Sequence, residues 1–104
     1  MKQLQQGDVL LKIIKEIPKG ATEVKRKNEA IVLAEGEATG HAHRIMDIDA
    51  MFFEKDGKFY LKNDKAVTLT HEEHKPLVIE PGIWEVGQVK EKDWLSGMTR
   101  TVAD

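Results

Sequence analysis

Turn-forming residues recur along this chain about every 8 to 12 positions, and short runs of strand-forming residues lie between them. No stretch repeats its apolar residues at the helical period of about 3.6. The clearest segment is 52–61, where Asp56-Gly57 favours a two-residue type I′ turn because both central residues need a positive φ. In that register Phe53 faces Tyr60 and Phe52 faces Leu61, so apolar residues pair across the ladder. The spacing therefore predicts antiparallel strands joined by hairpins.

Further strands are predicted wherever alternating or apolar runs stand between turn signals. The turns Pro18-Lys19-Gly20 and Arg26 to Glu29 are two such signals, and the apolar run 30–34 is short enough for a strand buried on both faces. The other predicted strands are 9–14, 67–71, 75–80 and 83–89. We expect about nine or ten strands with little or no helix, folded as a single small barrel or jelly roll. Residues 1–104 then form one all-β domain, in which 90–104 is a polar C-terminal tail or an edge strand.

Composition excludes several classes of protein and of site. The chain has 104 residues and no cysteine, which excludes disulfides, thiolate zinc sites, iron–sulfur clusters and cysteine nucleophiles. A net charge of −2 gives no basic signature for nucleic acid. No run approaches the roughly 20 apolar residues of a membrane span, and Met1 to Asp8 lacks the apolar core of a secretory signal. We expect a cytoplasmic protein with neither a nucleic-acid nor a membrane partner.

All four histidines fall between positions 41 and 74, in the pairs His41/His43 and His71/His74. On a strand, His41 and His43 point to the same face and stand about 6 to 7 Å apart. Two imidazoles at that separation can share one metal ion, since metal–nitrogen bonds are about 2.0 to 2.1 Å. Ile45 continues this face, which makes it inward, while Ala42 and Arg44 point outward.

The second pair is less regular. His71 shares its parity with the apolar Val67 and Leu69, so it ends a core-facing row. His74, three residues on, lies on the opposite face unless a turn or bulge intervenes. Without one, His71 and Glu73 form the same-face pair.

These patterns predict a metal site. Its expected ligands are His41, His43 and His71, with His74 or Glu73 completing the set. Such a site suits a divalent transition metal (zinc, iron, manganese or nickel), and the sequence does not rank them. Glu73 and Asp47 are the candidate catalytic carboxylates, with Glu37 as a further one. The alternatives stay open: histidines that are exposed or hydrogen-bonded without a metal, and Asp47 in an exposed loop.

The segment around the first histidine pair carries a resemblance to a known superfamily. It is Gly36-Glu37-Ala38-Thr39-Gly40-His41-Ala42-His43, and Pro81-Gly82 precedes the last predicted strand. Over about residues 31–89 the chain resembles the cupins. The glycine, His-x-His and acidic residue of the first cupin motif correspond to Gly36, His41, His43 and Asp47, with one residue fewer between Gly36 and His41 and aspartate for the usual glutamate. The second motif departs further, because Pro and Gly are adjacent and no histidine follows them.

This resemblance implies a double-stranded β-helix, a small jelly-roll barrel with a metal inside, and a homo-oligomer. A third ligand has to come from His71 or His74, since none follows Gly82. The pattern is also similar to small uncharacterised proteins of bacteria and their phages, a likeness that implies no activity.

Three hypotheses for function follow. The first is a cupin-like, histidine-coordinated metal-binding protein with a small-molecule ligand, and whether it is an enzyme stays open. The second is a structural, phage-type oligomer whose metal is held by His-x-His from several chains. The third is a metal-free interaction module in which residues 71–74 form a pH-sensitive surface.

Overall fold

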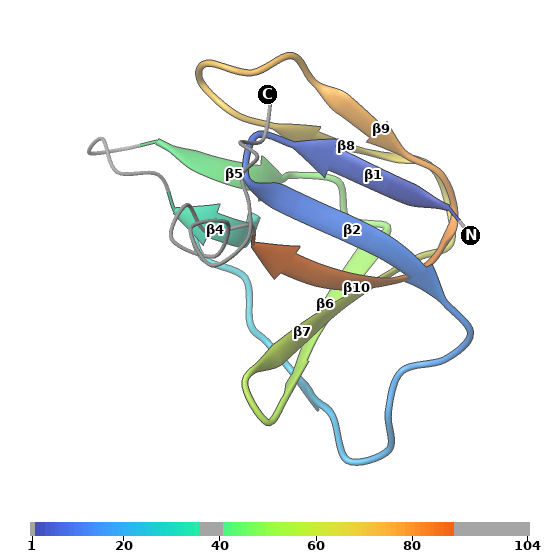
Figure 1. Cartoon of the computed structure of the whole chain (residues 1–104). Helices are drawn as coiled ribbons and strands as arrows, with labels where there is room; N and C mark the ends of the chain where they lie inside the picture. The colour runs from blue at the N-terminus through green and yellow to red at the C-terminus, as the bar shows by residue number, and fades with distance from the viewer. Residues whose placement is uncertain (1, 36–40, 89–104) are drawn as a thin grey trace, which may run out of the picture.

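The computed structural model describes residues 2–35 and 41–88, and over these ranges the chain forms ten β-strands and no helix (Figure 1). All the strand pairings are antiparallel. The strands are β1 (Gln3–Gln6), β2 (Val9–Ile14), β3 (Thr22–Glu23), β4 (Ile31–Glu35), β5 (Ala42–Ile45), β6 (Ala50–Lys55), β7 (Lys58–Asn63), β8 (Val67–Thr70), β9 (Leu77–Ile79) and β10 (Gly82–Gln88). The predicted all-β class and strand number are confirmed.

Two sheets make up the domain. The larger has the order β1-β2-β10-β7-β6-β3 and the smaller the order β4-β5-β8-β9. Their inner faces enclose one apolar core in which Leu11, Ile45, Leu61, Leu69 and Trp84 have no exposed surface. Burial of these side chains supplies the main driving force for folding. The result is a small barrel or sandwich.

The central hairpin has the predicted register. Phe53 pairs with Tyr60 and Phe52 with Leu61 across β6 and β7. Asp56 and Gly57 have φ of 53° and 83°, as a type I′ turn requires. Trp84, expected in the core, is fully buried there, whereas Trp94 lies outside the described residues.

Gln6 connects the edge strand β1 of the larger sheet to β8 and the β8–β9 connection of the smaller sheet. It is the last residue of β1 and is only 4% exposed. Its side-chain Nε2 donates to the carbonyl of Leu69 in β8 at 2.9 Å and to the carbonyl of Lys75 at 2.8 Å. These bonds join the edge strand β1 to the segment between β8 and β9, which lies beside it in Figure 1. A buried amide in this position satisfies two backbone acceptors.

Some predicted details differ from the structure. β4 is mostly half-buried rather than buried on both faces, because it is an edge strand of the smaller sheet. The strand predicted at 67–71 ends at Thr70, and the one at 75–80 covers only Leu77–Ile79. The predictions for 90–104, including an edge strand at 99–102, fall outside the described residues. None of the described residues belongs to a helix that could cross a membrane.

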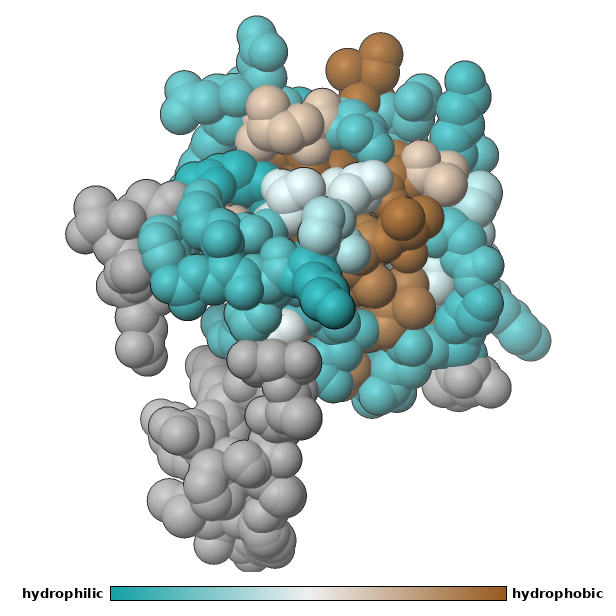
Figure 2. Space-filling view, turned by 90° about the horizontal axis from the view of Figure 1, so that it is seen from above, coloured by the Kyte–Doolittle hydropathy of each residue, from teal (hydrophilic) through white to brown (hydrophobic). Residues whose placement is uncertain are grey.

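The face at the top of Figure 1, where β8 and β9 lie, is mixed in character. Figure 2 shows polar side chains over most of it, with exposed apolar groups between them. Val78 of β9 is one exposed apolar residue, at 62% exposure. Single apolar residues of this kind are normal on a protein surface.

Candidate functional site

Three chain segments meet at one end of the two sheets. They are the turn Gly7-Asp8 between β1 and β2, the residues that begin β5, and the connection 71–76 between β8 and β9. Antiparallel pairing of Arg44 with Thr70 brings the start of β5 beside the end of β8. The start of one strand and two connections therefore supply the side chains of the site.

All four histidines lie at this end. The ring centroid of His71 is 4.4 Å from that of His43, 4.6 Å from that of His74 and 5.7 Å from that of His41. The rings of His43 and His74 are stacked at 5.8 Å. Residues 72–74 form bends, so His74 reaches the same cluster as His71. The structure thus brings together the imidazoles of the four predicted ligands, which we call the histidine cluster.

Gly7 lies against this cluster and leaves no room for a side chain. Its φ is +58°, and a Cβ at this position would lie 2.6 Å from His74 Nε2 and 3.2 Å from His43 Cε1. Both the backbone conformation and the close approach favour glycine.

His43 is the buried member, with 2% exposure. Its Nδ1 is 2.8 Å from Gln6 Oε1, and its Nε2 is 3.3 Å from Asp8 Oδ1. Burial lowers the pKa of His43, and the nearby His71 lowers it further, whereas Asp8 acts in the opposite direction. The neutral imidazole, the form that ligates metals, is favoured.

His41 and His71 are half-buried and each contacts Glu73. His41 Nδ1 lies 3.7 Å from Glu73 Oε2. The backbone N–H of Glu73 donates to His71 Nδ1 at 3.0 Å. A neutral His71 that accepts this bond carries its proton on Nε2, so it gains a free ring nitrogen only if the Glu73 bond opens. His41, His71 and Glu72 also offer ligand atoms within 4.8 Å of one another.

Glu72 is tied to β5. Its carboxylate accepts from the backbone N–H of Ala42 at 3.0 Å and from Arg44 Nη1 at 2.5 Å. The Arg44 bond, and after it the Ala42 bond, lower the pKa of Glu72 to about 2. A carboxylate that is ionised above about pH 2, and paired with Arg44, therefore stands beside the histidine cluster.

Asp47 is not brought to the cluster. Its Oδ2 accepts from the backbone N–H of Thr68 at 3.0 Å, near the start of β8, whereas His71 follows the end of that strand. Asp47 therefore bonds to the backbone at the opposite end of β5 from His41. Ala42, expected to point outward, is 4% exposed; Ile45 is buried as expected. Glu37 lies outside the described residues.

Three polar residues near the cluster did not emerge as candidate ligands from the sequence: Gln6, Asp8 and Gln88. Asp8 Oδ2 accepts from Gln88 Nε2 at 2.7 Å, which holds its other oxygen toward His43. Gly7-Asp8 opens the run predicted as the strand 9–14, and no strand was predicted before it, so nothing local indicated Gln6. The pairing of positions 8 and 88 had no local signal.

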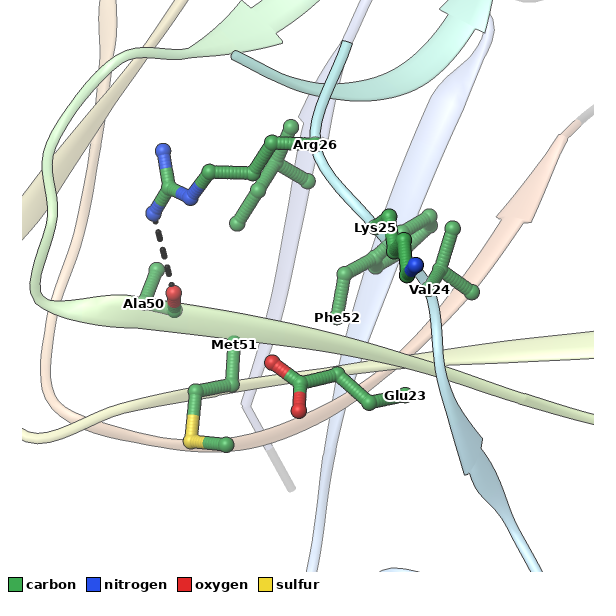
Figure 3. Close-up of a pocket in the computed structure, with 8 residues that line it drawn as sticks. Glu23, Val24, Lys25, Arg26, Ala50, Met51 and Phe52 are labelled. Carbon is green, nitrogen blue, oxygen red and sulfur yellow. Dashed lines mark hydrogen bonds between the residues drawn. The ribbon is translucent and has the colours of Figure 1, made fainter. Parts of the chain in front are cut away.

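Two of the hollows lined by the described residues differ in their position relative to the cluster. One, of about 450 Å³, is lined by residues that include Gln6, Glu73 and His74, so it adjoins the histidine cluster. The other, of about 410 Å³, lies between residues 23–26 and β6 (Figure 3). There Arg26 donates to the carbonyl of Ala50 at 3.0 Å, and no histidine is among its lining residues. Only the first hollow combines space with titratable side chains of the cluster.

Comparison with known proteins gives a family and no activity. Neither the curated proteins nor the solved structures contain a match to the chain. Residues 5–88, which include β2 to β10 and every residue of the histidine cluster, match one family over most of the chain. The chain belongs to the family described as a domain of unknown function, DUF8820.

Proposed function

We propose that this protein binds a divalent transition metal ion at the histidine cluster. The observation that carries the proposal is the convergence of four imidazoles from two separate segments, with neighbouring ring centroids 4.4 to 5.8 Å apart. Neutral imidazoles gain little from packing together, because they bury little apolar surface. Protonated imidazoles repel one another. A bound cation gives the arrangement a favourable energy.

The cluster supplies donor atoms of a suitable kind. Among the described residues, the groups whose ligand atoms already lie within 4.8 Å of one another are His41, His71 and Glu72, so binding through His43 and His74 as well requires their side chains to turn toward a shared ion. The Nδ1 atom of His71 becomes available if its bond to Glu73 opens. Carboxylates from Asp8, Glu72 and Glu73 lie around the same end of the sheets and balance the ion's charge. Nitrogen and oxygen donors of this kind suit zinc, iron(II), manganese or nickel.

A bound ion would supply Lewis acidity to a ligand or to water. Among this chain's own residues, Glu73 is the candidate for moving a proton, because its carboxylate is 70% exposed and lies 3.7 Å from His41. Asp47 is less suited, since its carboxylate bonds to Thr68. The hollow beside Glu73 and His74 is the place for a small-molecule ligand. Membership of the cupins, the cytoplasmic location and a homo-oligomeric state remain parts of this proposal.

The convergence within one chain favours a site completed by one subunit over one shared by several. In the structural-oligomer hypothesis, His41 and His43 of each chain would have to face neighbouring chains. Here instead His41 and His43 both contact His71 of their own chain.

Elemental analysis of protein purified without a histidine tag, followed by titration of the chelator-treated protein with Zn²⁺, Mn²⁺, Fe²⁺ and Ni²⁺, tests the proposal. We expect close to one ion per chain and a rise in the unfolding temperature with the ion that binds. His41→Ala with His43→Ala should abolish binding, and Asp49→Asn, an exposed residue near the other end of β5, should leave it unchanged. A wild-type protein that binds none of the four ions contradicts the proposal. An oligomer that a chelator dissociates favours the structural alternative.

A further inference from the structure

Gln6 fixes which nitrogen of His43 is free. The amide orientation of Gln6 is determined by two carbonyls, since Nε2 donates to Leu69 and to Lys75. Its Oε1, which can only accept, faces His43 Nδ1 at 2.8 Å. His43 Nδ1 must therefore carry a hydrogen, and a neutral His43 presents its lone pair on Nε2.

A second acceptor lies near that nitrogen. Asp8 Oδ1 lies 3.3 Å from His43 Nε2, and the carboxylate of Asp8 has no hydrogen to donate when ionised. Two acceptors at this distance repel unless a positive species stands between them. The candidates are a second proton on His43 or a metal ion bound by both atoms.

The separation matches shared coordination. Two ligand atoms bound to one ion at about 2.0 to 2.1 Å and a tetrahedral angle lie about 3.3 to 3.5 Å apart. Asp8 is held for this role by Gln88, which donates to its other oxygen at 2.7 Å. The side chain of Asp8 is 47% exposed, so an ion placed there can be reached from solvent.

We propose, on the basis of the metal-binding function above, that His43 Nε2 and Asp8 Oδ1 are the two anchoring ligands of the ion, and that Gln6 is a positioning residue that fixes the His43 tautomer. Asp8, rather than the motif residue Asp47, thereby supplies a carboxylate to the site. Gln6 acts in the way that hydrogen-bonding partners of ligating histidines do, by holding the ring and its tautomer.

The first test uses metal-free wild-type protein and needs no ion. Long-range ¹H–¹⁵N correlation spectra of the histidine rings at about pH 8, where an ordinary imidazole is neutral, report which nitrogen is protonated. We expect a single proton on Nδ1 of His43. A proton on Nε2, or on both nitrogens, overturns the proposal whatever the protein binds.

The second test measures Zn²⁺ affinity by calorimetry, or that of whichever ion the wild type binds. Asp8→Asn should weaken binding by at least about tenfold, and Gln6→Met by about 10- to 100-fold. The matched control is Asp64→Asn, an exposed aspartate in the turn that precedes β8, at the opposite end of that strand from His71.

The outcomes separate the two proposals. A wild type that binds an ion, together with an Asp8→Asn variant of equal affinity, overturns the anchoring pair and leaves the metal-binding function standing. A wild type that binds no ion refutes the metal-binding function and with it the anchoring pair, even where the Nδ1 tautomer is found. Asp8→Asn keeps an acceptor for Gln88, so its fold is expected to persist even where Gln6→Met is unstable.

Discussion

Replacing Gln6 with methionine keeps the length of the side chain and removes every hydrogen bond it makes. The carbonyls of Leu69 and Lys75 lose a donor, and the Nδ1–H of His43 loses its acceptor. Gln6 and His43 are 4% and 2% exposed, so water does not readily replace these partners. The two sheets that Gln6 joins also lose a direct polar link.

The expected cost follows from those groups. A buried donor or acceptor left without a partner costs about 1 to 3 kcal/mol, and counting His43 and one carbonyl gives about 2 to 6 kcal/mol in total. For a domain of this size that corresponds to a fall in unfolding temperature of about 10 to 30 °C. The loss is a large part of the roughly 5 to 15 kcal/mol that holds a typical domain folded.

Urea unfolding of the metal-free protein, followed by far-ultraviolet circular dichroism, measures this loss. The urea concentration at the midpoint of unfolding should fall, while the slope of the free energy of unfolding against urea stays the same, because the surface exposed on unfolding is unchanged. Gln3→Met is the matched control, since Gln3 is an exposed residue of the same strand. If Gln6→Met lowers the free energy of unfolding by less than about 0.5 kcal/mol, or by no more than Gln3→Met does, the assignment of Gln6 as a buried hydrogen-bonding link between the two sheets is refuted.

Three further predictions concern glycines and pH. Gly57→Ala should lower the free energy of unfolding by about 1 kcal/mol, because φ of Gly57 is +83° and no atom lies within 4 Å of the added Cβ. Gly7→Ala should lower it further and shift the ring signals of His74, because the added Cβ would lie 2.6 Å from His74 Nε2. Equal losses for the two variants would contradict the close approach at Gly7. Folding lowers the pKa of His43 below 6.5 and that of Glu72 to about 2, so in acid the unfolded state binds more protons than the folded state. The free energy of unfolding should therefore fall as the pH drops below 6.5, because of His43, and again between pH 4.5 and 2, because of Glu72. Glu72→Gln should flatten the second fall, and an unchanged acid limb in denaturant unfolding at several pH values would contradict the role of its bond with Arg44.

Local chemistry explains the part of the fold that the sequence predicted. The type I′ turn needs positive φ at two adjacent positions, and Asp56-Gly57 supplies residues that tolerate it, so the register of β6 and β7 follows directly. Alternation likewise placed β8. Edge position is not encoded locally, which is why β4 was expected to be more buried than it is.

The positions of the histidines were likewise predictable in part from the local sequence and in part only from the fold. Period-two alternation indicated that His43 and Ile45 face inward, and both are buried. The strand rule placed His74 on the wrong face unless the chain turned, and the bends at residues 72–74 provide that turn. The carboxylate beside His43 could not be predicted, because Asp8 reaches it from another sheet and is held by a residue 80 positions away.

The proposed pair of Asp8 and His43 joins the two sheets, and this has a consequence for local opening of the fold. Asp8 follows β1 of the larger sheet, whereas His43 belongs to β5 of the smaller one. An ion held by both would act as a cross-link between layers that otherwise touch mainly through side chains. Its occupancy should therefore slow amide hydrogen exchange in β1 and β5 together, so that two strands far apart in sequence report on one event.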